Sequence, residues 1–161
     1  MGQTLLDGIF NDITRTFYVL DVLTWAGYDY TNCETDFRFY WLQQKMAELG
    51  SIKGSIKIVL IPALQMNELS KQLAYDLNEL LDAESEVFVD GFLFYHNEMQ
   101  YIPGVTPLVG WLKPAMISDQ LGFTPHEVIL TLEPFFIHIK IRIHSLGLIY
   151  SFPSYGYFLE L

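Results

Sequence analysis

The 161-residue sequence has one cysteine, Cys33, and therefore cannot form a disulfide within the chain. It has no Asn-x-Ser/Thr sequon of the kind that marks glycosylated secreted proteins. It also has no uncharged apolar run of the roughly 20 residues that a membrane-spanning helix needs. Its first residues lack the basic stretch followed by an apolar one that signals secretion. These absences predict a cytosolic or nuclear protein that has no membrane partner.

Basic residues are also scarce. The chain has 9 Lys and Arg against 19 Asp and Glu, for a formal net charge of −10, and no two basic residues are adjacent. Proteins that bind along a nucleic-acid backbone need clustered Lys and Arg, because much of their affinity comes from counterion release. We therefore expect no binding to DNA or along an RNA backbone. A ligand of one or two nucleotides, held by stacking and a few contacts, is compatible with this charge.

Hydrophobic residues, by contrast, make up 51% of the chain and aromatic residues 16%, which argues against disorder and allows one domain with a sizeable core. Apolar residues at helical spacing predict one helix that is capped by Thr35 and ended by Gly50, and a second that begins at Asn67. With the strands, this predicts an α+β fold of mostly antiparallel sheets and two packed helices. The predicted strands are residues 5–10, 16–23, 55–61, 87–95, 108–112 and the perfectly alternating segment 137–144.

Three carboxylates, Asp7, Asp21 and Asp90, each interrupt an otherwise apolar predicted strand. Because isolated burial of a charge is costly, each is expected to be paired, hydrogen-bonded or near the mouth of a site. The favoured interpretation is structural: Asp7-Gly8 and Asp90-Gly91 are bulges or strand ends, where glycine permits an unusual backbone.

Nucleophiles and metal ligands are not grouped in the sequence. Cys33 precedes a predicted helix N-terminus, where a thiolate can be stabilised, but no histidine lies near it, and we interpret it as structural. His138 and His144 alternate with isoleucines and are expected on the solvent face of a strand. Neither H-x-x-x-H nor C-x-x-C occurs, so we expect no metal site and no cofactor.

Trp111 is the candidate for ligand binding. It lies next to Gly110 and just before Lys113 in the segment TPLVGWLKP, residues 106–114. A neighbouring glycine can leave one ring face uncrowded, and an indole is a good platform for a base, especially a cationic one. The alternative is that Trp111 is a core residue, as most tryptophans of α+β domains are, and spacing alone favours that alternative.

A family resemblance favours ligand binding over a core role for Trp111. Four motifs occur in sequence: TLLDGIF at residues 4–10, TFYVLDVL at 16–23, VDGFLF at 89–94 and YIPGVTPLVGWLKP at 101–114. Their order and spacing resemble those of the nucleotidyltransferase fold of mRNA capping enzymes. Three motifs give a closer resemblance: CETDFRFYW at residues 33–41, VDGFLFYH at 89–96 and TPLVGWLKP at 106–114. This closer resemblance is to the snurportin family, import adaptors that bind the trimethylguanosine cap of spliceosomal small nuclear RNAs.

The resemblance covers about residues 2–122. It implies a partial cap-binding domain over residues 1–122 and a divergent hydrophobic tail of one or two strands over residues 123–161. Trp111 matches the tryptophan that stacks on the methylated guanine, and Lys113 the place of a basic residue near the cap phosphates. The implied partners are trimethylguanosine-capped small nuclear RNA and, in the full-length family, importin-β and an export receptor. The implied localisation is shuttling between cytoplasm and nucleus.

Departures from the capping-enzyme pattern argue against catalysis. The capping-enzyme nucleophile is a lysine upstream of the region that matches TLLDGIF, and this sequence begins at that region. Ile9 replaces an acidic residue, and Lys113 alone remains of a lysine pair. Nucleotidyl transfer needs an activated nucleophile and stabilisation of the phosphate charges, so no enzyme activity is expected.

The family's basic importin-β-binding segment and first strands are also not matched, so we expect a truncated chain. Three alternatives to cap binding stay open. One is a truncated product without cap binding, and another is a catalytically dead relic that binds a guanine nucleotide. The third is a partner module that uses residues 137–143 as an exposed edge strand.

Overall fold

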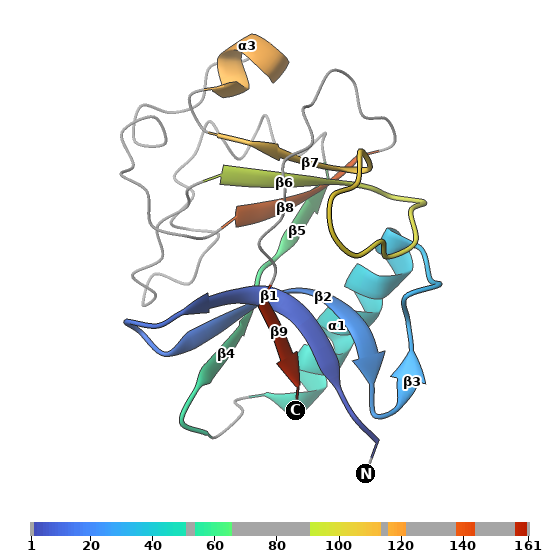
Figure 1. Cartoon of the computed structure of the whole chain (residues 1–161), viewed down its shortest axis with the longest axis vertical. Helices are drawn as coiled ribbons and strands as arrows, with labels where there is room; N and C mark the ends of the chain where they lie inside the picture. The colour runs from blue at the N-terminus through green and yellow to red at the C-terminus, as the bar shows by residue number, and fades with distance from the viewer. Residues whose placement is uncertain are drawn as a thin grey trace. The chain divides into compact units, whose positions relative to one another are not determined.

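The computed structural model describes residues 2–50, 54–65, 91–113, 116–121, 138–143 and 157–160 (Figure 1). The chain divides into two compact units, each made of discontinuous segments. The first unit comprises Met1–Ile61, Asn97–Thr106 and Pro153–Leu161. The second unit comprises Pro62–His96 and Pro107–Phe152.

The first unit is built on a hairpin of β1 (Leu5–Asn11) and β2 (Thr16–Trp25), which pair antiparallel as the sequence predicts. The strand β3 (Tyr28–Asp29) follows through Ala26 and Gly27, which both have the positive φ that a type I′ turn requires. Two further strands complete this sheet: β9 (Tyr157–Glu160) pairs antiparallel with β1, and β4 (Lys57–Leu60) pairs parallel with β2.

The hairpin register shifts between Asp7 and Gly8, which confirms the structural interpretation of this pair. A Cβ atom at Gly8 would collide with the Tyr18 carbonyl oxygen and would lie 2.7 Å from the Phe17 ring. Glycine is therefore needed where the strand bends, because the partner strand passes too close for a side chain.

The helix α1 (Thr35–Leu49) ends at Gly50, as predicted, and Gly50 has a φ of 60°. The predicted cap is wrong. Glu34 is the N-cap residue and makes no side-chain cap, whereas Thr35 is the first helical residue and its hydroxyl donates to the Met99 carbonyl oxygen at 3.2 Å. The Thr35 oxygen, which a cap would use as an acceptor for a backbone N–H, instead accepts from Arg38 Nη2 at 3.2 Å.

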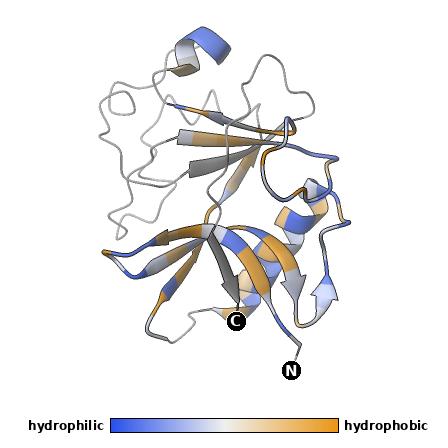
Figure 2. Ribbon diagram, viewed as in Figure 1, coloured by the Kyte–Doolittle hydropathy of each residue, from blue (hydrophilic) through white to orange (hydrophobic). Residues whose placement is uncertain are grey.

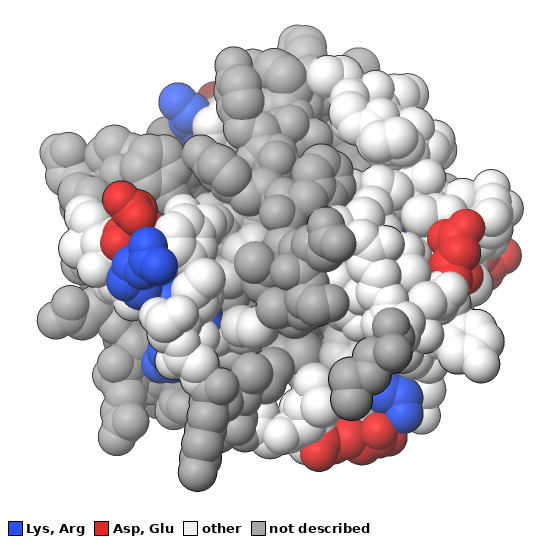
Figure 3. Space-filling view, turned by 60° about the horizontal axis from the view of Figure 1, so that its bottom comes forward, with Lys and Arg blue, Asp and Glu red and all other residues white. Residues whose placement is uncertain are grey.

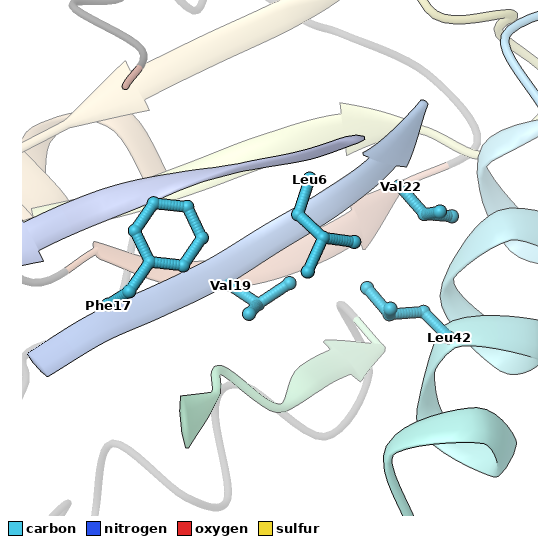
Figure 4. Packing of buried hydrophobic residues seen from close by; sticks show 5 residues of the cluster. All are labelled: Leu6, Phe17, Val19, Val22 and Leu42. Carbon is cyan, nitrogen blue, oxygen red and sulfur yellow. The ribbon is translucent and has the colours of Figure 1, made fainter. Parts of the chain in front are cut away.

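The core of the first unit forms where the helix meets the hairpin. Leu42 of α1 packs with four strand residues, Leu6, Phe17, Val19 and Val22 (Figure 4). Full burial of such a side chain contributes about 1.5–3 kcal/mol. Figure 2 shows hydrophobic residues along β1, β2 and α1. The same helix leaves Phe37 and Tyr40 exposed, at 48% and 62%.

The second unit contains a sheet in the order β5-β8-β6-β7. Its strands are β5 (Ala63–Gln65), β8 (His138–Ile143), β6 (Gly91–His96) and β7 (Val109–Leu112), and the helix α3 (Ile117–Leu121) follows β7. The alternating segment does form a strand, but β8 pairs in parallel with both β5 and β6. The hypothesis of an exposed edge strand is therefore wrong for the described residues 138–143, since β8 has a paired strand on each side.

The predicted α+β class, with sheet predominating, is confirmed. Among the described strands the antiparallel pairs are β1–β2, β1–β9, β2–β3 and β6–β7, and the parallel pairs are β2–β4, β5–β8 and β6–β8. No helix within the described ranges is long and apolar enough to cross a membrane. Four predictions fall outside the described residues and stay predictions: the helix from Asn67, the roles of Asp90 and His144, and the domain boundary at Gly122. The side chain of His138 is likewise not described.

Candidate ligand-binding site

Trp111 lies on β7, a strand in which partly exposed and buried residues alternate. Gly110 and Leu112 are buried, whereas Val109 and Trp111 are partly exposed. Because side chains alternate along a strand, Trp111 lies on the face opposite to Leu112. Its cross-strand neighbour is Leu93 of β6. Trp111 is thus partly exposed as a residue, whereas the Nε1 atom of its indole is buried.

The glycine that makes room for the indole is Gly91, at the start of β6. A Cβ atom there would collide with Trp111 Nε1 and would lie 3.0 Å from Cε2 and 3.1 Å from the Leu112 carbonyl oxygen. The Nε1–Cε2 side of the ring therefore rests against the β6 backbone. Sequence reasoning assigned this role to Gly110, the chain neighbour, and missed Gly91. The signal was the Asp90-Gly91 pair, but nothing in the sequence indicated which ring it would face.

Lys113 lies over the ring of Trp111. Its Nζ atom is 5.4 Å from the ring centroid, and the side chain is exposed. Residues two apart in an extended chain share a face, so the contact follows from local geometry. The Met116 N–H donates to the Lys113 carbonyl oxygen at 2.9 Å, which holds the chain as it leaves β7. The structure therefore brings together the two predicted site residues, and their part in cap binding stays a prediction.

Elsewhere in the described part of the chain, the charges do not form a basic surface. On the face in Figure 3, Lys and Arg side chains appear as small separate groups. Among the described residues, Arg15 pairs with Asp12 at 3.7 Å, Lys45 with Glu48 at 2.7 Å, and Arg38 with Asp21. No group of three or more His, Cys, Asp and Glu in these ranges is placed to hold a metal ion.

Asp21, which interrupts an otherwise apolar strand in the sequence, has a structural role. It accepts hydrogen bonds from Arg38 Nε at 3.0 Å and from Nη2 at 2.8 Å, and it also accepts from the Val22 N–H. The Arg38 guanidinium further donates to the carbonyl oxygens of Cys33 and Met99, at 2.6 and 3.1 Å. The predicted pairing of Asp21 is confirmed, and its satisfied hydrogen bonds suit it to holding the fold together.

Asp7 is tied to the segment Asn97–Thr106 of the same unit. Its Oδ2 atom accepts a hydrogen bond from the Tyr101 hydroxyl at 3.0 Å. Burial, and then the negative charge of Asp7, raise the pKa of Tyr101 above its usual range. At the surface, by contrast, hydrogen bonds from the Thr31 hydroxyl and backbone N–H lower the pKa of Asp29.

The part of the chain that carries Trp111 and Lys113 matches a known family. Residues 1–114 match the family described as Snurportin1, m3G cap-binding domain, and these are 114 of the 161 residues. The chain belongs to this family. Membership in the Snurportin1 cap-binding family confirms the snurportin resemblance seen in the sequence motifs. The match ends just after Lys113, so the indole, the lysine and Gly91 all lie inside the matched region. By its description this family is a binding module named for the m3G cap.

Proposed function

We propose that the chain binds the trimethylguanosine cap of small nuclear RNAs and that Trp111 is its stacking platform. The observation that carries the proposal is a partly exposed tryptophan, Trp111 on β7, inside the region that matches the Snurportin1 cap-binding family. Methylation at N7 makes the guanine cationic, which strengthens its attraction to an indole face. A single stacked base also suits a chain with a net charge of −10, because it needs no extended basic surface.

The proposed selectivity for the trimethylated cap follows from the hydrogen-bond donors that methylation removes. Two methyl groups on the exocyclic amine eliminate its hydrogen-bond donors, so the site would recognise shape and apolar contact. A less methylated cap would leave that space underfilled and bind more weakly. We propose that Lys113, which is exposed beside the indole, contacts the phosphates that follow the base in the cap.

We also propose the wider role that the family resemblance implies. In that role the chain is a binding module without catalytic activity, part of a nuclear import adaptor for small nuclear ribonucleoproteins that itself shuttles between cytoplasm and nucleus. Importin-β and the export receptor are its proposed partners in the full-length setting. Retention of trimethylguanosine-capped small nuclear RNA, but not of its uncapped form, on the immobilised chain would support this role. Equal retention of both would contradict it.

The direct test is a titration of the chain with trimethylguanosine cap dinucleotide, followed by tryptophan fluorescence. We expect saturable quenching in the wild type that is lost in both Trp111→Phe and Trp111→Ala, because each removes the indole that stacks and reports. Trp41→Phe is the matched control, because Trp41 lies in the first unit and packs on Tyr30 at a centroid distance of 4.3 Å. It should keep the quenching. No saturation in the wild type, or an unchanged curve in Trp111→Ala, would overturn the proposal.

The same titration with other ligands separates the alternatives. Monomethylated and unmethylated cap dinucleotides should compete more weakly than the trimethylated one. Unmodified GTP that binds as tightly, or that labels the protein covalently, would instead support a relic of a nucleotidyltransferase. Binding of none of them would support a product without cap binding.

A further inference from the structure

We propose that Lys113 regulates the Trp111 site by occupying it: in the free protein the lysine ammonium lies on the indole, and a cationic base must displace it to stack there. This proposal rests on the proposed function only for the identity of the natural ligand. The competition itself depends on two side chains of this chain and can be measured without any cap.

The contact has the geometry of a cation–π interaction. The Nζ atom of Lys113 lies 5.4 Å from the centroid of the Trp111 ring, within the roughly 6 Å over which a ring quadrupole attracts a cation. The lysine is exposed, so its side chain can move away without breaking a packed core. The backbone at Lys113, in contrast, is held by the hydrogen bond from the Met116 N–H at 2.9 Å. The lysine therefore stays within reach of the ring after it has been displaced.

The indole itself is held more firmly than the lysine. Its Nε1–Cε2 side rests against the β6 backbone at Gly91, where no side chain could fit. Trp111 is also paired across the strands with Leu93, which is buried. A base that stacks on the face under the ammonium must therefore move Lys113, because the Nε1–Cε2 edge of the ring is packed against β6 and the lysine is exposed.

The expected size of the effect follows from the strength of an exposed cation–π contact. A competitor of that strength lowers the affinity of a ligand about 2- to 5-fold. Every base displaces the same lysine, so all affinities fall by one factor and the ratio between two caps stays the same. A lysine that only holds phosphates would act with the opposite sign, since its removal would weaken binding. A ligand without phosphates therefore reports only the competition of Lys113 for the indole and not its contact with phosphates.

The test compares the wild type with Lys113→Ala and with Lys113→Arg, which keeps a cation over the ring. The first probe is 1-methylnicotinamide, an aromatic cation without phosphate, which quenches tryptophan fluorescence. The quenching constant of Trp111 is obtained by subtracting the signal of the matching Trp111→Phe variant. We expect this constant to rise about 2- to 5-fold in Lys113→Ala and not in Lys113→Arg. A constant that is unchanged or smaller in Lys113→Ala overturns the proposal.

Two further ligands distinguish this proposal from the proposed function. Trimethylguanosine nucleoside should gain the same factor in Lys113→Ala, whereas the cap dinucleotide gains less or loses affinity if the displaced lysine then meets a phosphate. If the quenching by 1-methylnicotinamide rises but no cap ligand binds, the competition stands and the cap-binding function fails. If the cap dinucleotide binds through Trp111 and the 1-methylnicotinamide constant does not rise, the function stands and the competition fails.

Discussion

The guanidinium of Arg38 and the carboxylate of Asp21 form an ion pair at 2.8 Å in which both side chains are completely buried. The pair joins the helix α1 to the central strand β2 of the first unit. The same guanidinium donates to the carbonyl oxygens of Cys33 and Met99. It thereby ties the segment before the helix and the segment Asn97–Thr106 to one point. Buried charges are tolerated only when they are paired and hydrogen-bonded, and here both conditions are met.

Replacement of Arg38 by methionine should therefore destabilise the first unit strongly. Asp21 would be left buried without its counter-charge, a loss expected to lower the free energy of unfolding by about 3–5 kcal/mol. Urea unfolding followed by circular dichroism measures it. Lys45→Met is the control, because it breaks an exposed ion pair with Glu48 and should cost less than about 1 kcal/mol. Similar costs for the two variants would show that the buried pair does not hold the unit together.

Stability should fall in alkaline solution because of Tyr101. Its pKa is raised by burial and by Asp7, so the folded chain keeps a proton that the unfolded chain releases above about pH 10. The stabilising contribution is complete below that pH and is lost as the pH rises further. Urea midpoints measured from about pH 9 to about pH 11 should decline more steeply in the wild type than in Tyr101→Phe. Tyr28→Phe, at a tyrosine that is 73% exposed, should decline like the wild type. Parallel curves for wild type and Tyr101→Phe would refute the linkage.

Gly91→Ala should disturb the indole of Trp111 directly. The new methyl group would collide with Nε1, and overpacking of this kind typically costs about 1–3 kcal/mol. We expect a shifted Trp111 emission and weaker quenching by the trimethylguanosine cap dinucleotide. Gly54→Ala is the matched control, since a Cβ there would have its nearest neighbour, the Ile56 carbonyl oxygen, at 3.8 Å. Normal emission and cap quenching in Gly91→Ala would mean that the ring does not rest on this glycine.

Ile141→Pro should disrupt the second sheet, because β8 is a central strand. Ile141 lies between Leu64 of β5 and Phe94 of β6. Proline lacks the amide N–H that one of these neighbours requires, and an unsatisfied ladder group costs about 1–3 kcal/mol. Loss of slow amide exchange in β6, measured by NMR, would report the damage. Ile141→Val keeps the N–H and should preserve that protection. Equal protection in the two variants would place the strand at an edge after all.

Local features of the fold could be predicted from the sequence because their determinants are close in the chain. The β1–β2 hairpin, the end of α1 at Gly50 and the bulge at Asp7-Gly8 depend on turn residues, spacing and glycine. The proximity of Lys113 to Trp111 is of the same kind, since residues two apart on a strand share a face.

Contacts between distant residues could not be predicted in this way. Asp21 and Arg38 are 17 positions apart, and Asp7 and Tyr101 are 94 apart. The sequence indicated only that each carboxylate needed a partner. The alternation in residues 137–144 predicted a strand but not its neighbours, because a period of two specifies which faces the side chains take and says nothing of which strands pair with it.

For Trp111, the residues themselves determined its chemistry: an indole beside a glycine and a lysine, in a segment that belongs to the Snurportin1 cap-binding family. The tertiary structure decided how that chemistry is presented. Pairing of β6 with β7 placed Gly91 against the indole and left Trp111 partly exposed, with the Lys113 ammonium over its ring. The physical reason is that a side chain's reactivity is local, whereas its accessibility depends on which backbone lies next to it.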